Sequence, residues 1–395
     1  MGPASLLAQR DLRLLVAAWG LSALGDFLAI VALTLRVEEQ TGSGFAVAAL
    51  LIAFSLPVAL LTPVGGWIVD RFETRTALAA TAAFQALVAA GLALFDGLAA
   101  TLALAFLLNA GLTVERPAIF ALIPRIVGEA AAPRAYGIME AVKYATVTTG
   151  MLLGGTLTQA FGASTALLAN AGTYVVAAGA ALALHTRRAR VDGDEDARGG
   201  MTAGLRLLWR DRLLRILIGV LAGSVVFAGV DNVANVFFAR DVLDVGGAGY
   251  GALSAAWGVG MVAGAVVAGR RIRPRLAPAA MLGAVGLMGA GIALTAATAT
   301  FVPALAFLLL GGFGNAVNNI GIRIVLQDRV EERMRGRAYG GFQGFMTIAD
   351  FVALASGGVL VELIGSRATL LLAGLGCVVA GLLGLPALRP ARGRR

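Results

Sequence analysis

Arg134-Ala135-Tyr136-Gly137 recurs 203 residues later as Arg337-Ala338-Tyr339-Gly340. The same offset relates Gly162 to Gly365. Tyrosine occurs only 5 times in the chain, so the shared tyrosine is not explained by a composition rich in alanine and glycine. Because the offset is about half of the 395 residues, the repeat indicates two similar halves.

The composition is that of a membrane protein. Hydrophobic residues make up 58% and charged residues 14%, against about 45–50% and about 25% in soluble domains. A transmembrane helix needs about 20 mostly apolar residues. The sequence contains twelve apolar runs of that length: 12–35, 45–68, 76–95, 99–123, 136–160, 164–184, 213–238, 248–269, 279–297, 300–323, 339–363 and 367–387.

The basic residues gather in alternate gaps between these runs. Of the 32 Lys and Arg residues, 27 lie in the termini and in every second gap, whereas three lie on the opposite side. This asymmetry predicts that both termini are cytoplasmic and that the number of spans is even. It also assigns the net charge of +9 to cytoplasmic loops, so we expect no nucleic-acid partner.

The repeat and the spans together predict the fold. We expect an all-α integral membrane protein with twelve transmembrane helices in two six-helix halves, related by a parallel repeat, as in two-half transporters. The expected parts are an N-terminal half at 1–186, a cytoplasmic linker at 187–211 and a C-terminal half at 212–395. We expect the chain to act as a monomer.

Scarce residue types exclude several functions. One Cys and one His leave no disulfide and no multi-His or Cys-based metal site. The only Lys, Lys143, follows Val142, so the glycine–lysine pair of a nucleotide-binding P-loop is absent. An intramembrane hydrolase needs an activated nucleophile or a metal cluster. The sequence therefore predicts no cofactor, no metal and no enzymatic activity.

The gap after the second span reads Gly66-Trp67-Ile68-Val69-Asp70-Arg71-Phe72-Glu73-Thr74-Arg75. It resembles the cytoplasmic loop motif G-x-x-x-D-R-x-G-R-R of the major facilitator superfamily. The residues that match are Gly66, Asp70, Arg71 and Arg75, whereas Glu73 and Thr74 depart from the pattern. The resemblance implies the major facilitator fold, with spans one, four, seven and ten around a central cavity.

The fifth span is similar to the antiporter motif of the same superfamily, G-x8-G-x3-G-P-x2-G-G. Gly137, Gly150 and the pair Gly154-Gly155 match, but Thr146 replaces a glycine and Met151 replaces the proline. Two further stretches, at 22–26 and 117–124, look like the enterobactin-exporter and macrolide-efflux branch.

Charged and amide side chains inside the spans need a reason, because an ionised residue at mid-bilayer costs about 2.5–3.5 kcal/mol on insertion scales. The candidates for proton coupling are Asp26, Asp231 and Asp350. The candidates for a gate or an ion pair are Glu115, Arg116, Glu140 and Lys143. The candidates for the substrate cavity are Asn109, Asn232, Asn235, Asn315 and Asn318.

Asp26 is the strongest coupling candidate, because it is central in its span and has no acid or base within four residues. The alternative is a structural aspartate that hydrogen-bonds to a neighbouring helix. Glu140 and Lys143 are three residues apart and can pair on one helix face. Arg116 is expected to lie within reach of Glu140 or Glu115.

The motif loop carries its own expectations. Asp70 is expected close to the N-terminus of span eleven, where the free N–H groups and the positive end of the helix favour an acid. Arg71 and Arg75 are expected to pair with acids or with lipid phosphates.

These features favour a transporter that uses no nucleotide. The leading hypothesis is a proton-coupled exporter of a small hydrophobic or amphipathic molecule, such as a drug, an antibiotic or a siderophore-like product, in a bacterial inner membrane. The expected partners are the small-molecule substrate, protons and the lipid bilayer. A proton-coupled symporter that imports a small solute remains the alternative on the same fold. A receptor or scaffold would need neither buried charges nor the motif loop.

Overall fold

The computed structural model describes residues 6–186, 209, 211–330 and 334–388, with the side chains of 335–337 excepted. Within these residues the secondary structure is helical, and no strand occurs. The chain divides into two compact units: unit 1 is Met1–Gly42 with Ala49–Asp194, and unit 2 is Ser43–Ala48 with Glu195–Arg395. The predicted linker at 187–211 lies almost wholly outside the described residues.

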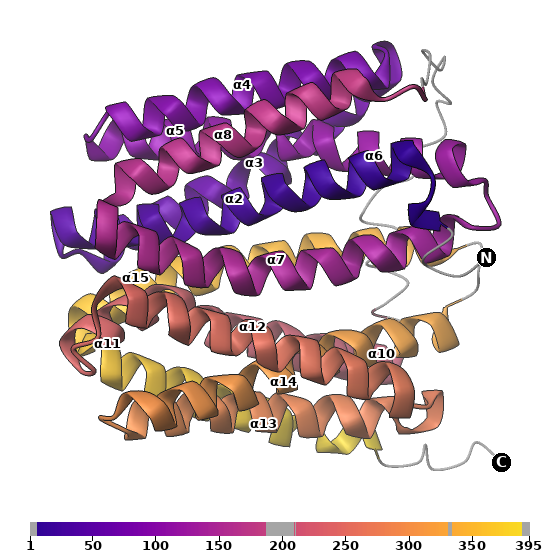
Figure 1. Cartoon of the computed structure of the whole chain (residues 1–395). Coiled ribbons are helices and arrows are strands. Elements are labelled where there is room, and N and C mark those ends of the chain that lie inside the picture. The colour runs from indigo at the N-terminus through magenta and orange to yellow at the C-terminus, as the bar shows by residue number, and fades with distance from the viewer. Residues whose placement is uncertain (1–5, 187–208, 210, 331–333, 389–395) are drawn as a thin grey trace, which may run out of the picture. The chain divides into compact units, whose positions relative to one another are not determined.

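Seven helices build unit 1 (Figure 1). They are α2 (Arg10–Thr41), α3 (Gly44–Arg71), α4 (Thr74–Leu94), α5 (Leu98–Ala110), α6 (Leu112–Val127), α7 (Ala132–Phe161) and α8 (Ala163–Ala183). The first turn of α3 belongs to unit 2. Helices α5 and α6 are two parts of one 30-residue membrane-length segment, separated at Gly111.

Unit 2 follows the same order. Its helices are α10 (Arg212–Gly229), α11 (Asp231–Asp241), α12 (Gly246–Arg271), α13 (Ala277–Ala297), α14 (Phe301–Arg329) and α15 (Arg335–Leu383). There are also two short 3₁₀ helices. One, Pro274–Leu276, directly precedes α13, and the other, Leu385–Leu388, follows α15 at the end of the described residues. Helices α10 and α11 again form one 30-residue segment, separated at Val230.

Ten segments of the described chain are long and apolar enough to cross a membrane. Helix α15 counts once among them, although it contains two helices joined at the non-helical residue Gly365. Helix α7 is not among the ten, because its second half is rich in threonine and glycine, yet it is 30 residues long. Adding α7 and the second helix of α15 accounts for the twelve predicted spans.

The repeat is present in the backbone as well as in the sequence. Gly162 lies between α7 and α8 with φ 81° and ψ 159°, and Gly365 divides α15 with φ 77° and ψ 164°. Residues other than glycine rarely adopt such a positive backbone φ angle. The same tight turn therefore joins the fifth span to the sixth and the eleventh to the twelfth.

Close packing inside unit 1 depends on small residues. Helix α2 packs along α7 and α8, and α4 packs along α8. A Cβ atom at Gly150 or Gly154 would stand 2.7 or 2.8 Å from the carbonyl oxygens of Leu24 and Leu28. The glycines of the antiporter-like pattern therefore let α7 approach the backbone of α2. Without the proline of that pattern, α7 runs unbroken from Ala132 to Phe161.

Two arginines on the side poor in basic residues cap helices. Arg36 is 5% exposed and donates to the carbonyl of Leu92 at 2.6 Å, near the end of α4. Arg367 donates to the carbonyls of Ala296 and Thr298 at 2.9 and 3.1 Å, at the end of α13. Cations at helix C-termini bind the last carbonyls and offset the negative end of the helix dipole.

Candidate functional site

A chain of buried hydrogen bonds crosses the interior of unit 1. The hydroxyl of Tyr174 on α8 donates to the carboxylate of Asp26 on α2. The side-chain amide of Gln85 on α4 donates to the Tyr174 hydroxyl at 3.3 Å and to the carbonyl of Leu108 on α5 at 3.1 Å. Tyr174 and Gln85 are each 1% exposed. Four helices are thereby joined through polar groups in an otherwise apolar interior.

The break between α5 and α6 makes room for this chain. A Cβ atom at Gly111 would stand 2.3 Å from the amide carbon of Gln85. Glycine is therefore required where the Gln85 side chain crosses α5 and α6. The new helix starts at Leu112 and carries Glu115 in its first turn.

Glu115 and Arg116 complete the polar group around Asp26. Both interact electrostatically with the Asp26 carboxylate. Within the described residues, neither side chain has a hydrogen bond or an ion pair within 4.0 Å. Two carboxyl groups and one guanidinium therefore share a small region at the meeting point of α2 and α6.

The predicted contact between Arg116 and Glu140 is not made. Among the described side chains, the ion-pair partner of Glu140 is Lys143, with Nζ and Oε2 3.9 Å apart. Both residues are about half exposed, at 52% and 46% of their side chains. Arg116 instead lies within electrostatic reach of Glu115, the other expected partner, and of Asp26.

A small cavity of about 40 Å³ lies inside unit 1 beside the polar group. It lies between α2, α4, α6 and α8. Its wall consists of Leu14, Leu15, Ala18, Trp19, Ser22, Leu78, Thr81, Ala82, Gln85, Glu115, Ile119, Tyr174, Ala177, Ala180, Ala181 and Leu184. Glu115 is the only ionisable carboxyl or basic group of that wall.

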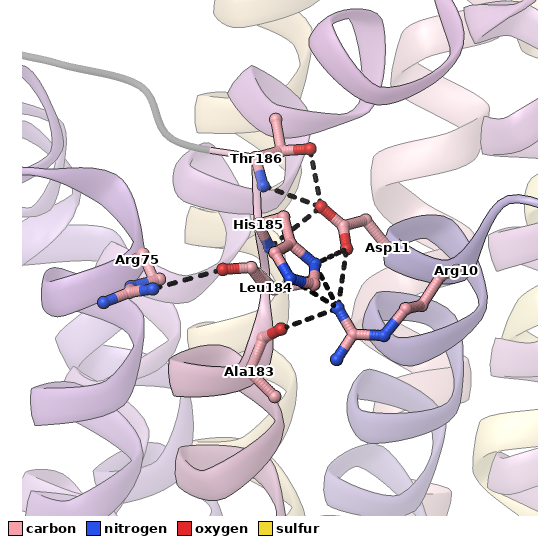
Figure 2. Close-up of polar contacts among 7 residues, drawn as sticks. All are labelled: Arg10, Asp11, Arg75, Ala183, Leu184, His185 and Thr186. Atoms are coloured by element: carbon pink, nitrogen blue, oxygen red, sulfur yellow. Dashed lines mark hydrogen bonds and ion pairs between the residues drawn. The ribbon is translucent and has the colours of Figure 1, made fainter.

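The motif loop holds the end of α8 (Figure 2). Arg75 donates to the carbonyl of Leu184 at 3.2 Å, and Arg10 donates to the carbonyl of Ala183 at 3.1 Å. Arg71 stacks over the ring of Trp67, 5.4 Å from its centroid. The contacts found for Arg75 and Arg71 are thus to a carbonyl group and to an aromatic ring, and their expected pairing with acids or lipid phosphates stays a prediction. Carbonyls at a helix C-terminus attract cations as acids do.

Asp11 completes this cluster at the end of unit 1 where α2 begins. Its Oδ2 atom accepts from the backbone N–H of His185 at 3.0 Å, and from the N–H and hydroxyl of Thr186 at 2.7 Å each (Figure 2). The start of α2 is therefore fastened to the chain that leaves α8. Gly66 is half-buried and Asp70 is exposed. The expected contact of Asp70 with the start of span eleven stays a prediction.

The acids of unit 2 have different surroundings. Asp231 begins α11, directly after the break at Val230, and its Oδ1 atom is buried without a hydrogen-bond partner in the described structure. Cys377 lies within electrostatic reach of Asp231, and its thiol contacts the carbonyl of Ser224 at 3.5 Å. Asp350 on α15 is half-buried and lies close to Gly229 at the end of α10.

The predicted cavity asparagines have individual surroundings in the two units. Asn109 and Asn232 donate to carbonyls of their own segments, those of Ala105 and Gly229, at 3.2 and 3.1 Å. Asn315 accepts from Asn319 at 2.7 Å. Asn235 and Asn318 each have a buried carbonyl oxygen without a hydrogen-bond partner among the described residues. None of the five predicted asparagines lines the cavity of unit 1.

Three site residues escaped the sequence analysis: Tyr174, Gln85 and Asp11. The signal for Gln85 was a long amide in an apolar span, which is costly without a partner. Tyr174 is one of only 5 tyrosines. Within the described residues, no group of three or more His, Cys, Asp or Glu side chains could hold a metal ion.

The sequence matches known proteins along most of its length. Residues 15–353 match the family described as the Major Facilitator Superfamily. The chain is 28% identical to the MFS-type transporter YfiS of Bacillus subtilis (strain 168), over 98% of this chain and 95% of that protein. It is 26% identical to the multidrug efflux pump Tap of Mycobacterium tuberculosis (strain ATCC 25618 / H37Rv), over 93% of this chain and 92% of that protein.

Solved structures share the fold at low identity. The nucleoside transporter NupG superposes with a TM-score of 0.76 at 14% identity, covering 97% of this chain and 100% of NupG. A bacterial homologue of the human lysosomal transporter Spinster superposes with a TM-score of 0.73 at 12% identity, covering 96% of each chain. At these identities the likeness concerns the fold alone.

Proposed function

Because the chain belongs to the major facilitator superfamily, we propose that this membrane transporter is a proton-coupled exporter of a small hydrophobic or amphipathic molecule. The proposed substrates are drugs, antibiotics or siderophore-like natural products. In this proposal the transporter works as a monomer in a bacterial inner membrane, with both termini in the cytoplasm. The charge asymmetry of the loops supports that orientation.

The polar group around Asp26 carries the proposal. Asp26 lies within the first span, hydrogen-bonded to Tyr174 and electrostatically coupled to Arg116 and Glu115. With both acids ionised, the group has a net charge of minus one, and a single bound proton makes it neutral. Charge inside a bilayer is costly. The group is therefore suited to bind one proton when its surroundings become less polar and to release it when they become more polar.

Protonation of Asp26 would alter what holds α6 to α2. The ionised carboxylate attracts Arg116 on α6, whereas the protonated carboxyl does not. The hydroxyl of Tyr174 is the neighbouring group on α8 that a change at Asp26 reaches first. Protonation of Asp26 would therefore favour an arrangement of α2 and α6 in which Arg116 is released, whereas the ionised form favours the arrangement in which it is held. A difference of this kind is what coupling of a proton to a conformational change requires.

Three observations support export over import. The glycines of the antiporter-like pattern, Gly150 and Gly154, lie directly against the backbone of α2, the helix that carries Asp26. The relative Tap is a multidrug efflux pump. The resemblance to the enterobactin-exporter and macrolide-efflux branch points the same way.

Everted membrane vesicles test the direction. Their cytoplasmic face is outside, and an imposed gradient makes the lumen acidic. An exporter that exchanges protons accumulates its substrate in the lumen, whereas an importing symporter depletes it. We expect accumulation of ethidium, tetraphenylphosphonium or erythromycin, and loss of that accumulation when nigericin collapses the pH gradient. Accumulation that survives nigericin, or no accumulation above vesicles without the protein, would contradict the proposal.

A further inference from the structure

Unit 2 contains a counterpart of the pair formed by Asp26 and Tyr174. At the offset of 203, Tyr174 on the sixth span corresponds to Cys377 on the twelfth, and Asp26 corresponds to Gly229, two residues before Asp231. Asp231 lies within electrostatic reach of Cys377. In each unit, therefore, an acid of the first span lies near the same position of the last span.

Asp231 lacks the donors that surround Asp26. The carboxylate of Asp26 accepts from a tyrosine hydroxyl and interacts with an arginine. In unit 2 the thiol of Cys377 is directed at the carbonyl of Ser224, at 3.5 Å. Within the described residues Asp231 makes no hydrogen bond and no ion pair, and its Oδ1 atom is buried.

The backbone at the start of α11 does not supply the missing donors. Asp231 is the first residue of α11, a place where free N–H groups can hold a carboxylate. Here the N–H groups of Val233 and Ala234 donate to the carbonyl of Val230, at 3.2 and 3.1 Å. Val230 itself has helical dihedral angles, φ −58° and ψ −32°, so α11 continues from α10 without an open first turn. The buried oxygen of an ionised Asp231 would therefore lack a partner, which is unfavourable.

The helices packed against α11 supply no cation to Asp231 in the described structure. These helices are α15 and α12. On α15, Cys377 and Asp350 are acids, and Arg367 donates to carbonyls at the end of α13. On α12, Tyr250 is buried, and the two arginines occupy the last turn, away from the connection to α11.

Asn235 presents a second buried oxygen one turn further along α11. Its side chain is 6% exposed, and its Oδ1 atom has no hydrogen-bond partner among the described residues. Positions four apart on a helix share a face, with Cβ atoms about 5–6 Å apart. Buried acceptors without a donor are rare in folded proteins and need an explanation. A protonated carboxyl has one O–H donor, so a single proton on Asp231 would give both oxygens a partner.

We propose that Asp231 is a proton-binding site of unit 2, in which the carboxyl hydrogen is donated to the amide oxygen of Asn235. The bound proton makes the carboxyl neutral, which suits an apolar place inside a membrane span. The site is separate from the polar group around Asp26, and its proton is additional to any that Asp26 carries. The inference is independent of the proposed function, because protonation at equilibrium requires neither a gradient nor transport.

Infrared spectroscopy of the full-length protein in lipid nanodiscs tests the proposal, because protonated carboxyl groups absorb apart from ionised carboxylates and amides. The spectrum of Asp231→Asn is subtracted from that of the original protein at neutral pH. We expect the difference to contain the C=O band of a protonated carboxyl, which moves to lower frequency in D₂O. The same subtraction in an Asn235→Leu background is expected to give this band at higher frequency, because the hydrogen bond is lost.

Two further variants make the result specific. The subtraction in an Asp350→Asn background, which lacks another acid of unit 2, is the matched control and is expected to leave the frequency of the band unchanged. Asp231→Glu keeps an acid but displaces it, so it is expected to move the band, and it replaces Asp231→Asn if that variant does not fold.

Three results would overturn the proposal. The first is the absence of a protonated carboxyl band from the difference at neutral pH, which would mean that Asp231 is ionised and held by the amide group of Asn235. The second is removal of the band by Na⁺, which would mean that a metal cation occupies the site. The third is an unchanged frequency in the Asn235→Leu background, which would mean that Asn235 does not accept the proton.

Discussion

The hydroxyl of Tyr174 on α8 donates a hydrogen bond to the carboxylate of Asp26 on α2, although 148 residues separate them in sequence. This bond links the first span to the sixth within unit 1. Tyr174 is itself held by the amide of Gln85 from α4. The acid proposed to carry the proton is therefore fixed from two other helices.

Tyr174→Phe removes the donor to Asp26 and leaves the ring in place. Buried hydrogen bonds between membrane helices contribute about 1 kcal/mol. We expect Tyr174→Phe to lower the thermal unfolding temperature measured by intrinsic fluorescence in a fixed detergent. Tyr136→Phe is the control, because the Tyr136 hydroxyl donates to the carbonyl of Phe120 at an exposed place. Equal unfolding temperatures for the two variants would show that the Asp26–Tyr174 bond contributes no special stability.

Arg116 and Asp26 are predicted to be energetically coupled. Arg116→Gln alone leaves a carboxylate inside the unit without its cation, whereas Arg116→Gln combined with Asp26→Asn removes both charges. We expect the double variant to be more stable than the sum of the single effects implies, by about 0.5 kcal/mol, the low end of the range for coupled residues, because the two side chains interact electrostatically without direct contact. Additive effects in the cycle, measured by unfolding in mixed micelles, would contradict the coupling.

Asp11 is predicted to contribute more to the stability of the fold than other residues at the start of α2. It accepts three hydrogen bonds from His185 and Thr186. Asp11→Ala removes these partly buried hydrogen bonds, each of which contributes about 0.5–1.5 kcal/mol. We expect Asp11→Ala to unfold at a lower temperature than Arg13→Ala, a change at an exposed residue of the same helix. Similar temperatures for both variants would refute the prediction.

The fold was predictable because each membrane span can be recognised from one continuous segment of the sequence. Apolar length, the distribution of arginine and the repeated turn at Gly162 and Gly365 are each local signals. Asp26 was recognisable for the same reason, since an acid in an apolar run is conspicuous. The break of the fourth span at Gly111 was not predicted, and neither was the close approach of the Gln85 side chain from another helix at that glycine.

The partners within the site were harder to predict, because they depend on which helix faces lie together. The choice of Tyr174 for Asp26 follows from the packing of α2 against α8. Arg116 was expected to reach Glu140 or Glu115, and it interacts electrostatically with Glu115 and also with Asp26, which was not anticipated. Arg75 was expected to pair with an acid or a lipid phosphate, and the contact that the structure shows for it is the carbonyl of Leu184 after the end of α8. Sequence alone gives residue types and spacing. To predict these partners, one must also know how each helix is rotated about its axis, and therefore which of its faces meets which neighbour.

The central claim is that Asp26 couples protons to transport, and Asp26→Asn tests it most directly. Vesicles that contain the variant are assayed with the probe that the original protein accumulates, both under an imposed pH gradient and in gradient-free exchange of labelled for unlabelled probe. The account predicts that Asp26→Asn keeps the exchange, because the asparagine preserves the hydrogen-bond acceptor, and loses accumulation driven by the gradient. Accumulation as strong as that of the original protein, or loss of both activities in a folded variant, would contradict it.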